Sequence, residues 1–355
     1  TLPGLGSYVQ LAVDAKDMRA LGLALLTMAI VIVLVDQLFW RPIVAWSDKF
    51  RLEQSAAAAA PSSWMFDLVK AANIPEMIGR AFAPLVDATN AFLRRLTKPR
   101  PPRDEIPRGS RVDRIYNLAL AAIVAVLVVV GLNFILTTVG IGEVFHVISL
   151  GFATLARVFV LLIFATLIWT PVGVAIGFNP RLAQVMQPVV QFLASFPANF
   201  VFPFATLFFI GAHIDINYGC ILLMALGSQW YILFNAIAGA QSIPTELREM
   251  ATDFQLQGWK RWQKLIIPGI FGSWVTGAIT ASGGAWNASI VSEVVSWGNK
   301  TLTAFGLGSY VADATGKGDW PRITLGVSVM SLFVVIINRT LWRRLYALAE
   351  RKFQL

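Results

Sequence analysis

The chain has 355 residues, of which 56% are hydrophobic and 14% charged, with a mean hydropathy of +0.65. A soluble domain carries about 25% charged residues, so this composition excludes an ordinary water-soluble protein and indicates one embedded in lipid. The net charge of +9 would suit nucleic-acid binding, but the positions of the charges indicate a membrane protein with no nucleic-acid partner.

Apolar segments that are long enough, or nearly so, to cross a bilayer as helices dominate the chain, since a span takes about 20 residues. The predicted fold is an all-α, polytopic transmembrane helical bundle. Pro197 and Pro203 interrupt the fourth segment, and the sixth is rich in Gly, Ser and Ala. In chain order, the seven predicted spans are 21–40, 115–136, 155–178, 185–210, 218–240, 266–291 and 323–337.

The distribution of basic residues predicts the orientation of these spans. About 23 of the 29 Lys and Arg residues fall on one side of the membrane if that side holds 41–114, 179–184, 241–264 and 339–355. Cytoplasmic loops are enriched in Lys and Arg. We therefore expect a multi-pass protein of the bacterial inner membrane with a cytoplasmic C-terminus.

The sequence contains an internal repeat. Residues 4–9 (Gly-Leu-Gly-Ser-Tyr-Val) reappear as 306–311, and the match continues without a gap to a second Trp-Arg pair at 342–343. Such self-similarity indicates a duplicated structural unit. We predict that 1–53 is the tail of an upstream module, with an outer loop, one span and a basic tail, and that 114–355 is a complete six-span module. Either sequence upstream of Thr1 is missing, or only the last helix of the upstream module survives.

Residues 54–113 are predicted to link the two modules. An alanine run at 56–60 and a Pro-rich stretch at 98–103 are typical of linkers. Between them, 64–96 shows apolar residues at helical spacing with interspersed arginines. This pattern predicts amphipathic helices on the inner membrane face, or alternatively a cytoplasmic helical hairpin packed on protein.

The longest polar loop of the second module, 241–264, carries the most informative pattern. Thr245 is placed to cap a short helix, and Gly258 to end it. Pro268 is placed to bend the chain where the sixth span begins. The sequence thus predicts a short helix held outside the membrane and joined directly to a span.

This loop resembles the coupling loop of ABC importer permeases. Their pattern has Glu-Ala-Ala, a following Gly, and a Pro nineteen residues after the Glu; Glu249, Ala251 and Pro268 sit at the matching positions. Met250 replaces the first Ala, and Gln255 takes the usual Gly position. The resemblance implies a helix that lies in a groove of an ATPase subunit. The implied coupling residues are Glu246, Glu249, Ala251, Gln255, Gly258, Trp259 and Pro268.

Further motifs are similar to the nitrate/sulfonate/taurine/bicarbonate branch of these permeases. They are Asn-Pro-Arg-Leu at 179–182, Phe-Pro-Ala-Asn at 196–199, Ala-Trp-Asn at 285–287 with Glu293, and Gly-Leu-Gly at 306–308. The tail at 1–53 resembles a subgroup of duplicated anion permeases. The implied fold is that of a type I ABC importer permease. The implied partners are an ABC ATPase dimer, a periplasmic or lipid-anchored solute-binding protein, a second permease module and membrane lipid.

The chain itself is expected to be no enzyme and to hold no cofactor. Residues 298–301 and 316–318 lack the glycine-rich spacing that cradles nucleotide phosphates, so the partner ATPase would bind ATP and Mg. His146 and His213 stand apart, so no metal site is expected, and the single Cys220 is expected to be a buried apolar residue.

Polar side chains inside spans are costly, which makes them candidates for a solute pathway. The alternative for each is a hydrogen bond between helices. Glu293 is expected either to form a gating or structural ion pair, for which Arg157 is the candidate partner, or to contact solute. The candidate pathway residues are Asn199, Gln229, Asn235, Trp286, Asn287, Ser289 and Glu293.

Two other classes of protein remain open at this point. An ion-coupled secondary carrier or channel would need no ATPase, and the Pro197–Pro203 interruption is the feature that favours it. A membrane-embedded enzyme would need clustered His, Asp or Cys residues, and the sequence offers no such cluster.

Overall fold

The computed structural model describes the chain except for residues 1–2, 48–62, 73–82, 85–86, 91–110 and 353–355. The chain divides into two compact units, one of Thr1–Val33, Ser55–Ala58 and Ile135–Leu355, the other of Leu34–Gln54 and Ala59–Phe134. The alanine run at 56–60, the Pro-rich stretch at 98–103 and most of 64–96 lie outside the described residues. Within the described part of 64–96, α4 (Trp64–Ala71) is a helix capped by Ser63.

Helices dominate the described residues, as predicted, and a short antiparallel hairpin of β1 (Val294–Trp297) and β2 (Lys300–Thr303) adds to them. The remaining elements are α1 (Leu5–Asp14), α2 (Met18–Val35), η1 (Asp36–Trp40), α3 (Arg41–Ser47), α6 (Arg111–Thr138), α7 (Ile141–Phe178), α8 (Pro180–Ser195), η3 (Ala198–Phe200), α9 (Phe202–Gly211), α10 (Ile216–Ser228), α11 (Trp230–Ser242), α12 (Thr245–Asp253), α13 (Gly258–Arg261), η4 (Trp262–Ile266), α14 (Ile267–Ser292), α15 (Leu307–Lys317), α16 (Trp320–Ile337), η5 (Asn338–Trp342) and α17 (Arg343–Lys352).

Five helical stretches are long and apolar enough to cross a membrane, and a sixth arises if α10 and α11, which meet at a 45° bend, count as one span. These stretches coincide with six of the seven predicted segments. The fold class is therefore confirmed, with five to six candidate spans in the described residues.

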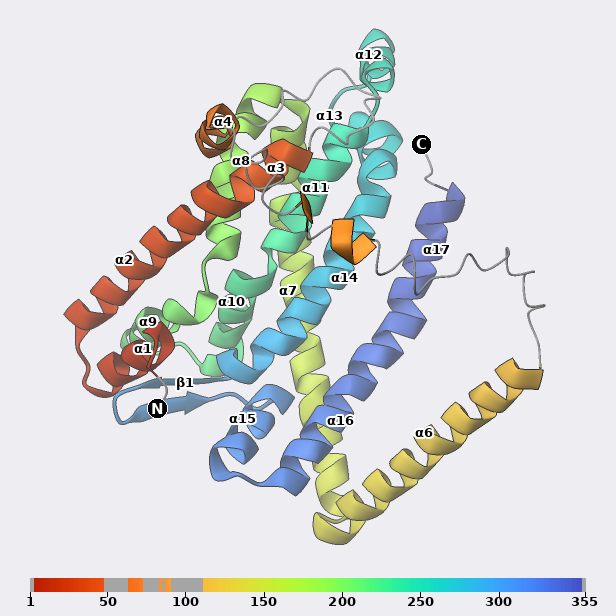
Figure 1. The fold of residues 1–355 in the computed structure, drawn as a ribbon. Helices are drawn as coiled ribbons and strands as arrows, with labels where there is room; N and C mark the ends of the chain where they lie inside the picture. The colour runs from red at the N-terminus through yellow and green to blue at the C-terminus, as the bar shows by residue number, and fades with distance from the viewer. Residues whose placement is uncertain (1–2, 48–62, 73–82, 85–86, 91–110, 353–355) are drawn as a thin grey trace. The chain divides into compact units, whose positions relative to one another are not determined.

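The fourth predicted span, 185–210, is not one helix. It is divided into α8 and α9, with residues 196–201 outside both α-helices. Phe196 has extended backbone angles (φ −74°, ψ 123°), because a residue that precedes proline disfavours the helical region. The two helices together still lead the chain from one end of the bundle to the other (Figure 1).

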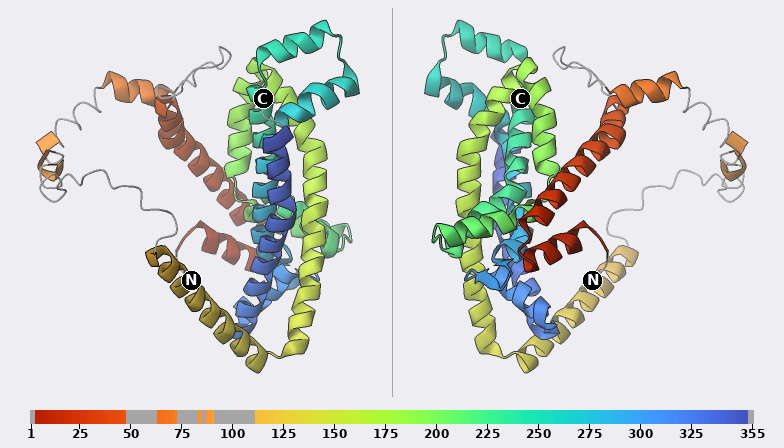
Figure 2. Two further views of the ribbon diagram at one scale, coloured as in Figure 1. Left: turned by 90° about the vertical axis from the view of Figure 1, so that its right-hand side faces the viewer. Right: turned by 90° about the vertical axis from the view of Figure 1, so that its left-hand side faces the viewer.

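The first unit is a bundle with two distinct ends. At one end, which we call the α12 end, lie the junction of α7 and α8, the loop with α12 and α13, and the end of α17 (Figure 1). At the opposite hairpin end lie α9, α15 and the β1–β2 hairpin. Figure 2 shows α12 and α13 projecting beyond the bundle at the end where the C-terminus lies.

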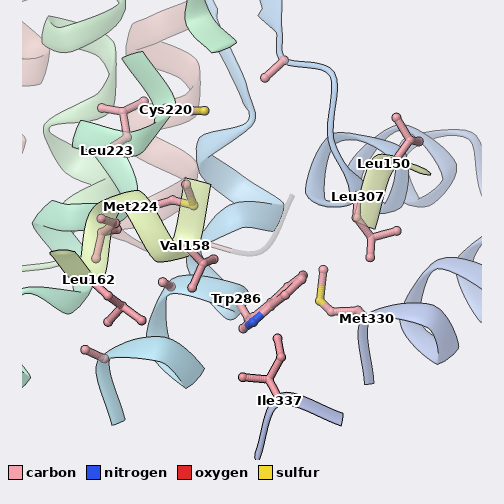
Figure 3. Packing of buried hydrophobic residues seen from close by; sticks show 14 of the residues in the cluster. Leu150, Val158, Leu162, Cys220, Leu223, Met224, Trp286, Leu307, Met330 and Ile337 are labelled. Atoms are coloured by element: carbon pink, nitrogen blue, oxygen red, sulfur yellow. The ribbon is translucent and has the colours of Figure 1, made fainter. Parts of the chain in front are cut away.

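The core of this bundle is formed mainly by α7, α10, α11, α14, α15 and α16. Figure 3 shows Val158, Trp286 and Met330 gathered in it, with the buried Cys220 farther away beside Leu223. Close helix contact depends on glycine: a Cβ on Gly173 would lie 2.6 Å from the Cβ of Ala236. Small residues at such contacts let two backbones approach each other closely.

The two copies of the repeat have the same local structure. At a constant shift along the chain (5 to 307, 18 to 320, 36 to 338, 41 to 343), α1, α2, η1 and α3 begin where α15, α16, η5 and α17 begin. Even the left-handed residue that ends the first helix recurs, as Lys16 (φ 57°) and Gly318 (φ 67°). Both copies thus form the same sequence of elements.

Candidate functional site

The short helix predicted in the polar loop exists as α12, and one face of it packs on the bundle. Ala251 is 4% exposed and lies with Leu247 against Ala240, Ile243 and Ile266. Thr245 was predicted to cap the helix, but it is the first helical residue, and Pro244 precedes it without a side-chain cap. The fixed φ of proline suits the start of a helix without such a cap.

Arg248 fastens α12 to the end of the preceding span. Its guanidinium donates to the carbonyl oxygens of Ala240 at 2.6 Å and Ile243 at 3.1 Å, and stacks 4.5 Å from the ring centre of Phe178. The last carbonyls of a helix lack partners within the helix, and a cation satisfies them well. Burial and the neighbouring Arg261 lower the pKa of Arg248. These contacts hold α12 in a fixed position on the bundle.

A left-handed turn ends α12. Gln255, at the position where the importer pattern has Gly, has φ 51°. Its N–H donates to the carbonyl of Thr252 at 2.9 Å, and the next N–H, of Leu256, donates to that of Ala251 at 2.8 Å. This is the Schellman arrangement that usually contains glycine. Gly258 is predicted to end α12, but it begins α13 instead, with φ 52°.

The outer face of the loop has no partner among the described residues. Glu246 and Glu249 are exposed without an ion pair there, and beside them Met250, Phe254 and Trp259 are 50%, 73% and 65% exposed. Large apolar side chains beside carboxylates on one projecting surface are typical of a protein contact site.

The loop continues into the membrane without a break. Gly258–Ser292 forms one helical stretch of 35 residues. Pro268 stands in its path at the second position of α14, directly after the π-helical turn η4. Because proline removes one backbone donor, a local change of helix type lets the helix continue. The predicted bend at Pro268 is thus absorbed in a continuous helix.

A buried polar cluster closes the hairpin end. Glu293 follows α14 and is 0% exposed; Arg157 of α7 donates from Nη1 to its Oε1 at 2.9 Å, which confirms the predicted pair. Thr154 donates to the same oxygen at 2.8 Å, and the N–H of Ser309 donates to Oε2 at 3.1 Å. The rest of the guanidinium binds the main-chain and side-chain oxygens of Asn217 on α10.

The repeated Gly-Leu-Gly motif shapes the cradle around this carboxylate. A Cβ on Gly306 would lie 2.2 Å from Oε2 of Glu293, and one on Gly308 would lie 2.3 Å from the carbonyl oxygen of Ser289. The N–H of Leu307 donates to Thr154 at 2.8 Å. Both carboxylate oxygens of Glu293 therefore accept hydrogen bonds. A buried ion pair is stable when its charged groups are hydrogen-bonded in this way.

The middle of α14 exposes polar or small residues, while Ile267 and Val291 near its ends are exposed and apolar. The helix α16 likewise exposes Thr324, Ser328 and Ser331. Thr276, Thr280, Gly283 and Asn287 are exposed at spacings of four, three and four residues, which places them on one side of the helix. We call these four residues the α14 stripe. On α7, by contrast, the exposed residues are apolar, including Ile163, Phe164, Leu167 and Ile168. Asn287 is among the predicted pathway residues, whereas the two threonines are not, because a threonine hydroxyl can bond a carbonyl of its own helix and is a weaker sign of a pathway than an amide.

The other predicted pathway residues are only partly brought together. Asn235 donates to the carbonyl of Tyr231 at 2.8 Å and lies against Gly277 of α14. Gln229 lies at the bend between α10 and α11 and accepts from Trp169 at 2.9 Å. Asn199 is exposed in η3.

Two of the predicted pathway residues belong to the core instead of to an open surface. Trp286 is 2% exposed, and its ring lies 5.9 Å from that of Phe333. Ser289 is 0% exposed and donates to the carbonyl of Trp286 at 2.7 Å. Their contacts are those of packing residues.

Apolar spans, a fastened loop at one end and a polar stripe along one span define a polytopic membrane protein of the transport class. The chain belongs to the family described as binding-protein-dependent transport system inner membrane component, which matches residues 169–354. The resemblance to ABC importer permeases is thereby confirmed, and the chain is an inner membrane component with several spans.

Several known proteins are similar to this chain. The nitrate import permease protein NrtB of Leptolyngbya laminosa is 24% identical over 186 residues, which cover 52% of this chain and 63% of the relative. The bicarbonate transport system permease protein CmpB of Synechococcus elongatus is 26% identical over 187 residues, covering 53% and 64%. Both matches span less than two thirds of the relative. Among solved structures, a chain of the MetNI methionine ABC transporter in inward facing conformations aligns with a TM-score of 0.44, 21% identity and coverage of 56% of this chain and 94% of that chain.

Proposed function

We propose that this chain is the transmembrane permease subunit of an ATP-driven ABC importer for a small anion or organic acid of the nitrate, sulfonate, taurine or bicarbonate type. A separate ATPase dimer would bind ATP and Mg and supply the energy. A periplasmic or lipid-anchored solute-binding protein would deliver the cargo. The chain would perform no catalytic step and hold no cofactor, and its C-terminus would face the cytoplasm. The nitrate and bicarbonate relatives support this class of cargo.

The observation that carries the proposal is the packing of α12 on the helical stretch that contains α14, since Ala251 lies in one buried cluster with Leu265 and Ile266. Arg248 fastens α12 to the end of α11, and Gly258–Ser292 runs as one helical stretch from the loop through the bundle. A partner that seats α12 in a groove would therefore move α14 with it, as in helix-in-groove recognition. Glu249, with Glu246, Trp259 and Gln255, would form the contact, and Ala251, Gly258 and Pro268 would shape the loop.

The α14 stripe supports a pathway for solute along the same helix. Polar groups that face lipid are costly, so a polar exposed face on a span favours a water-filled path. Thr276, Thr280 and Asn287 offer neutral hydroxyl and amide groups. The two hydroxyls donate to the carbonyls of Gly272 at 3.1 Å and Thr276 at 2.9 Å in α14, so each would have to rotate to donate to a solute. Neutral donors can stabilise a passing anion without holding it as tightly as a fixed cation would. We include Asn235 in this path, because it lies against Gly277 on α14.

Glu293 is proposed to act as a clamp at the hairpin end and not as a solute ligand. Its carboxylate is fully buried and its oxygens are occupied by Arg157, Thr154 and Ser309. A carboxylate would also repel an anionic cargo. The clamp joins α7, α10, α14 and α15, so opening of this end would require it to break or to move as one body.

Residues 1–53 are proposed to be the tail of a second permease module, joined by 54–113 to the module at 114–355. The matching element bounds of the two copies support this assignment. In addition, a Cβ at Gly4 or Gly6 would meet nothing within 4 Å, whereas the equivalent Gly306 and Gly308 enclose a carboxylate and a helix backbone. The turn at Gly4 and Gly6 therefore has room to enclose the equivalent carboxylate and helix backbone of another module. If so, Gly6→Leu should reduce assembly with that module while the thermal stability of this chain stays unchanged.

Co-purification with the ATPase tests the proposed function. Glu249→Lys reverses a charge on the exposed face of α12, so we expect the permease to remain monodisperse in detergent but to lose the ATPase. Glu350→Lys makes the same charge change on the exposed side of α17 and should retain the ATPase. Full retention in Glu249→Lys, or solute uptake by reconstituted chain with no ATPase present, would overturn the proposal; the second result would indicate a secondary carrier.

A further inference from the structure

A cleft of about 520 Å³ lies between α14, α16, η5 and α17. Arg339, Arg343 and Asn338 line it with Trp342 and Tyr346. Of the two aromatic residues, Trp342 is 6% exposed and Tyr346 is 47% exposed. The cleft therefore combines two guanidinium groups with aromatic side chains, and it plays no part in the proposed transport mechanism.

The two arginines have no acidic partner among the residues that the structure describes. Both side chains are exposed, and the ion pairs of α16 and its flanking turns in that part of the chain involve Arg322 and not Arg339 or Arg343. A guanidinium is a planar fork of donors that matches the oxygens of a phosphate group. Two such groups beside one cleft favour an anion as its occupant.

The internal repeat provides a comparison within the same chain. At the equivalent place in the first copy, Asp36 stands where Asn338 stands in the second, and Arg41 where Arg343 stands. There the arginine is neutralised, because its Nε lies 3.2 Å from the carboxylate of Asp36. The second copy has exchanged this acid for an amide, and it has Arg339 in place of a glutamine. The same turn therefore has one positive charge more and one negative charge fewer in the copy that forms the cleft.

The cleft lies where a predicted membrane span ends. Directly before it, α16 exposes Leu332, Val335 and Ile336, which are 54%, 57% and 48% exposed. Trp and Tyr side chains are enriched at the level of lipid headgroups, and arginines near span ends reach toward the same level. An occupant with both an anionic head and apolar chains would match the cleft and the apolar surface beside it.

We propose that this cleft binds the phosphate-bearing headgroup of an anionic phospholipid. The phosphate would lie between Arg339 and Arg343, with the headgroup against Trp342 and the acyl chains along α16. Basic pockets between spans are known to hold such headgroups, and each Lys or Arg near the membrane surface adds about 1 kcal/mol to the attraction. Removing one arginine should therefore weaken binding about fivefold, and removing both about thirtyfold.

The test uses the full chain, purified in a zwitterionic detergent and titrated with phosphatidylglycerol, phosphatidylcholine or inorganic phosphate. Bound lipid is counted by native mass spectrometry. We expect one phosphatidylglycerol to be retained in preference to phosphatidylcholine, with little binding of free phosphate. Arg339→Gln with Arg343→Gln should lose it, while Arg344→Gln with Arg351→Gln, which removes the same charge outside the cleft lining, should not.

Asn338→Asp gives a second variant that adds no bulk. It recreates the acid of the first copy, so the new carboxylate should pair with Arg343 and reduce lipid retention severalfold.

Several results would overturn the proposal. The first is equal loss of lipid in the Arg344/Arg351 control, and the second is equal retention of phosphatidylcholine and phosphatidylglycerol. The third is binding of inorganic phosphate with the same affinity as phosphatidylglycerol. The fourth is a second copy of the chain that covers the cleft at high protein concentration without lipid.

Discussion

The buried pair of Arg157 and Glu293 gives the sharpest stability prediction. Arg157→Met keeps an unbranched apolar stem but removes the guanidinium, which leaves the carboxylate, 0% exposed, with only the hydroxyl of Thr154 and one main-chain N–H. Breaking a buried ion pair by removal of one partner costs about 3–5 kcal/mol, because the remaining charge is uncompensated. By the scaling of about 2–4 °C per kcal/mol for larger domains, the apparent melting temperature should fall by about 10 °C.

A double-mutant cycle measures this coupling. Arg157→Met, Glu293→Gln and the combined variant are compared by thermal unfolding in detergent, with a tryptophan-fluorescence readout. We expect the double variant to be more stable than Arg157→Met alone, because the amide removes the stranded charge. If the two single effects simply add, or if Arg157→Met lowers the free energy of unfolding by less than about 0.5 kcal/mol, the Arg157–Glu293 ion pair does not stabilise the fold and the prediction is refuted.

Three further predictions concern single backbone and side-chain positions. Gln255→Gly should stabilise the loop by about 0.5 kcal/mol, since the left-handed conformation costs a non-glycine residue about 1–2 kcal/mol and glycine loses part of that gain in chain entropy; Gln255→Val should destabilise it, and equal melting temperatures would contradict this. Gly308→Ala should cost about 1–3 kcal/mol because its Cβ would press on a main-chain carbonyl of α14, whereas the repeat-equivalent Gly6→Ala, with nothing within 4 Å, should stay within about 0.5 kcal/mol. Thr280→Val should slow transport in reconstituted complex about two- to tenfold, the range of one neutral hydrogen bond, with an unchanged melting temperature; Thr324→Val on α16 is the control, and equal transport by both variants would remove the α14 stripe from the pathway.

Much of the fold could be predicted from the sequence, because its signals are local. Spans follow from apolar runs of about 20 residues, since the bilayer forces each helix to bond its own backbone. The polar loop between the fifth and sixth spans carried its pattern within a few turns of Glu249 and Pro268. The repeat was visible for the same reason, and the structure shows that matching residues form matching elements, down to the left-handed turn at Lys16 and Gly318.

Predictions from local sequence were wrong where a proline or glycine is compatible with more than one backbone conformation. Pro197 and Pro203 divide the fourth predicted span into two helices, whereas Pro268 is absorbed in a continuous one. Gly258 begins a helix, and the left-handed turn falls on Gln255 instead. Sequence marks where the backbone is special at such positions, but packing around them selects which conformation results.

Hydropathy and short motifs, which are read along the chain, were enough to predict a bundle of membrane-spanning helices with a polar loop outside the membrane. Which face of each helix is exposed became clear from the packing of the helices. This packing exposed Thr276 and Thr280 on α14, buried Trp286 in the core, and joined Arg157 to Glu293 from helices 136 positions apart in the sequence. Such pairings depend on the angles and rotations at which helices pack, and no pattern within one helix specifies these.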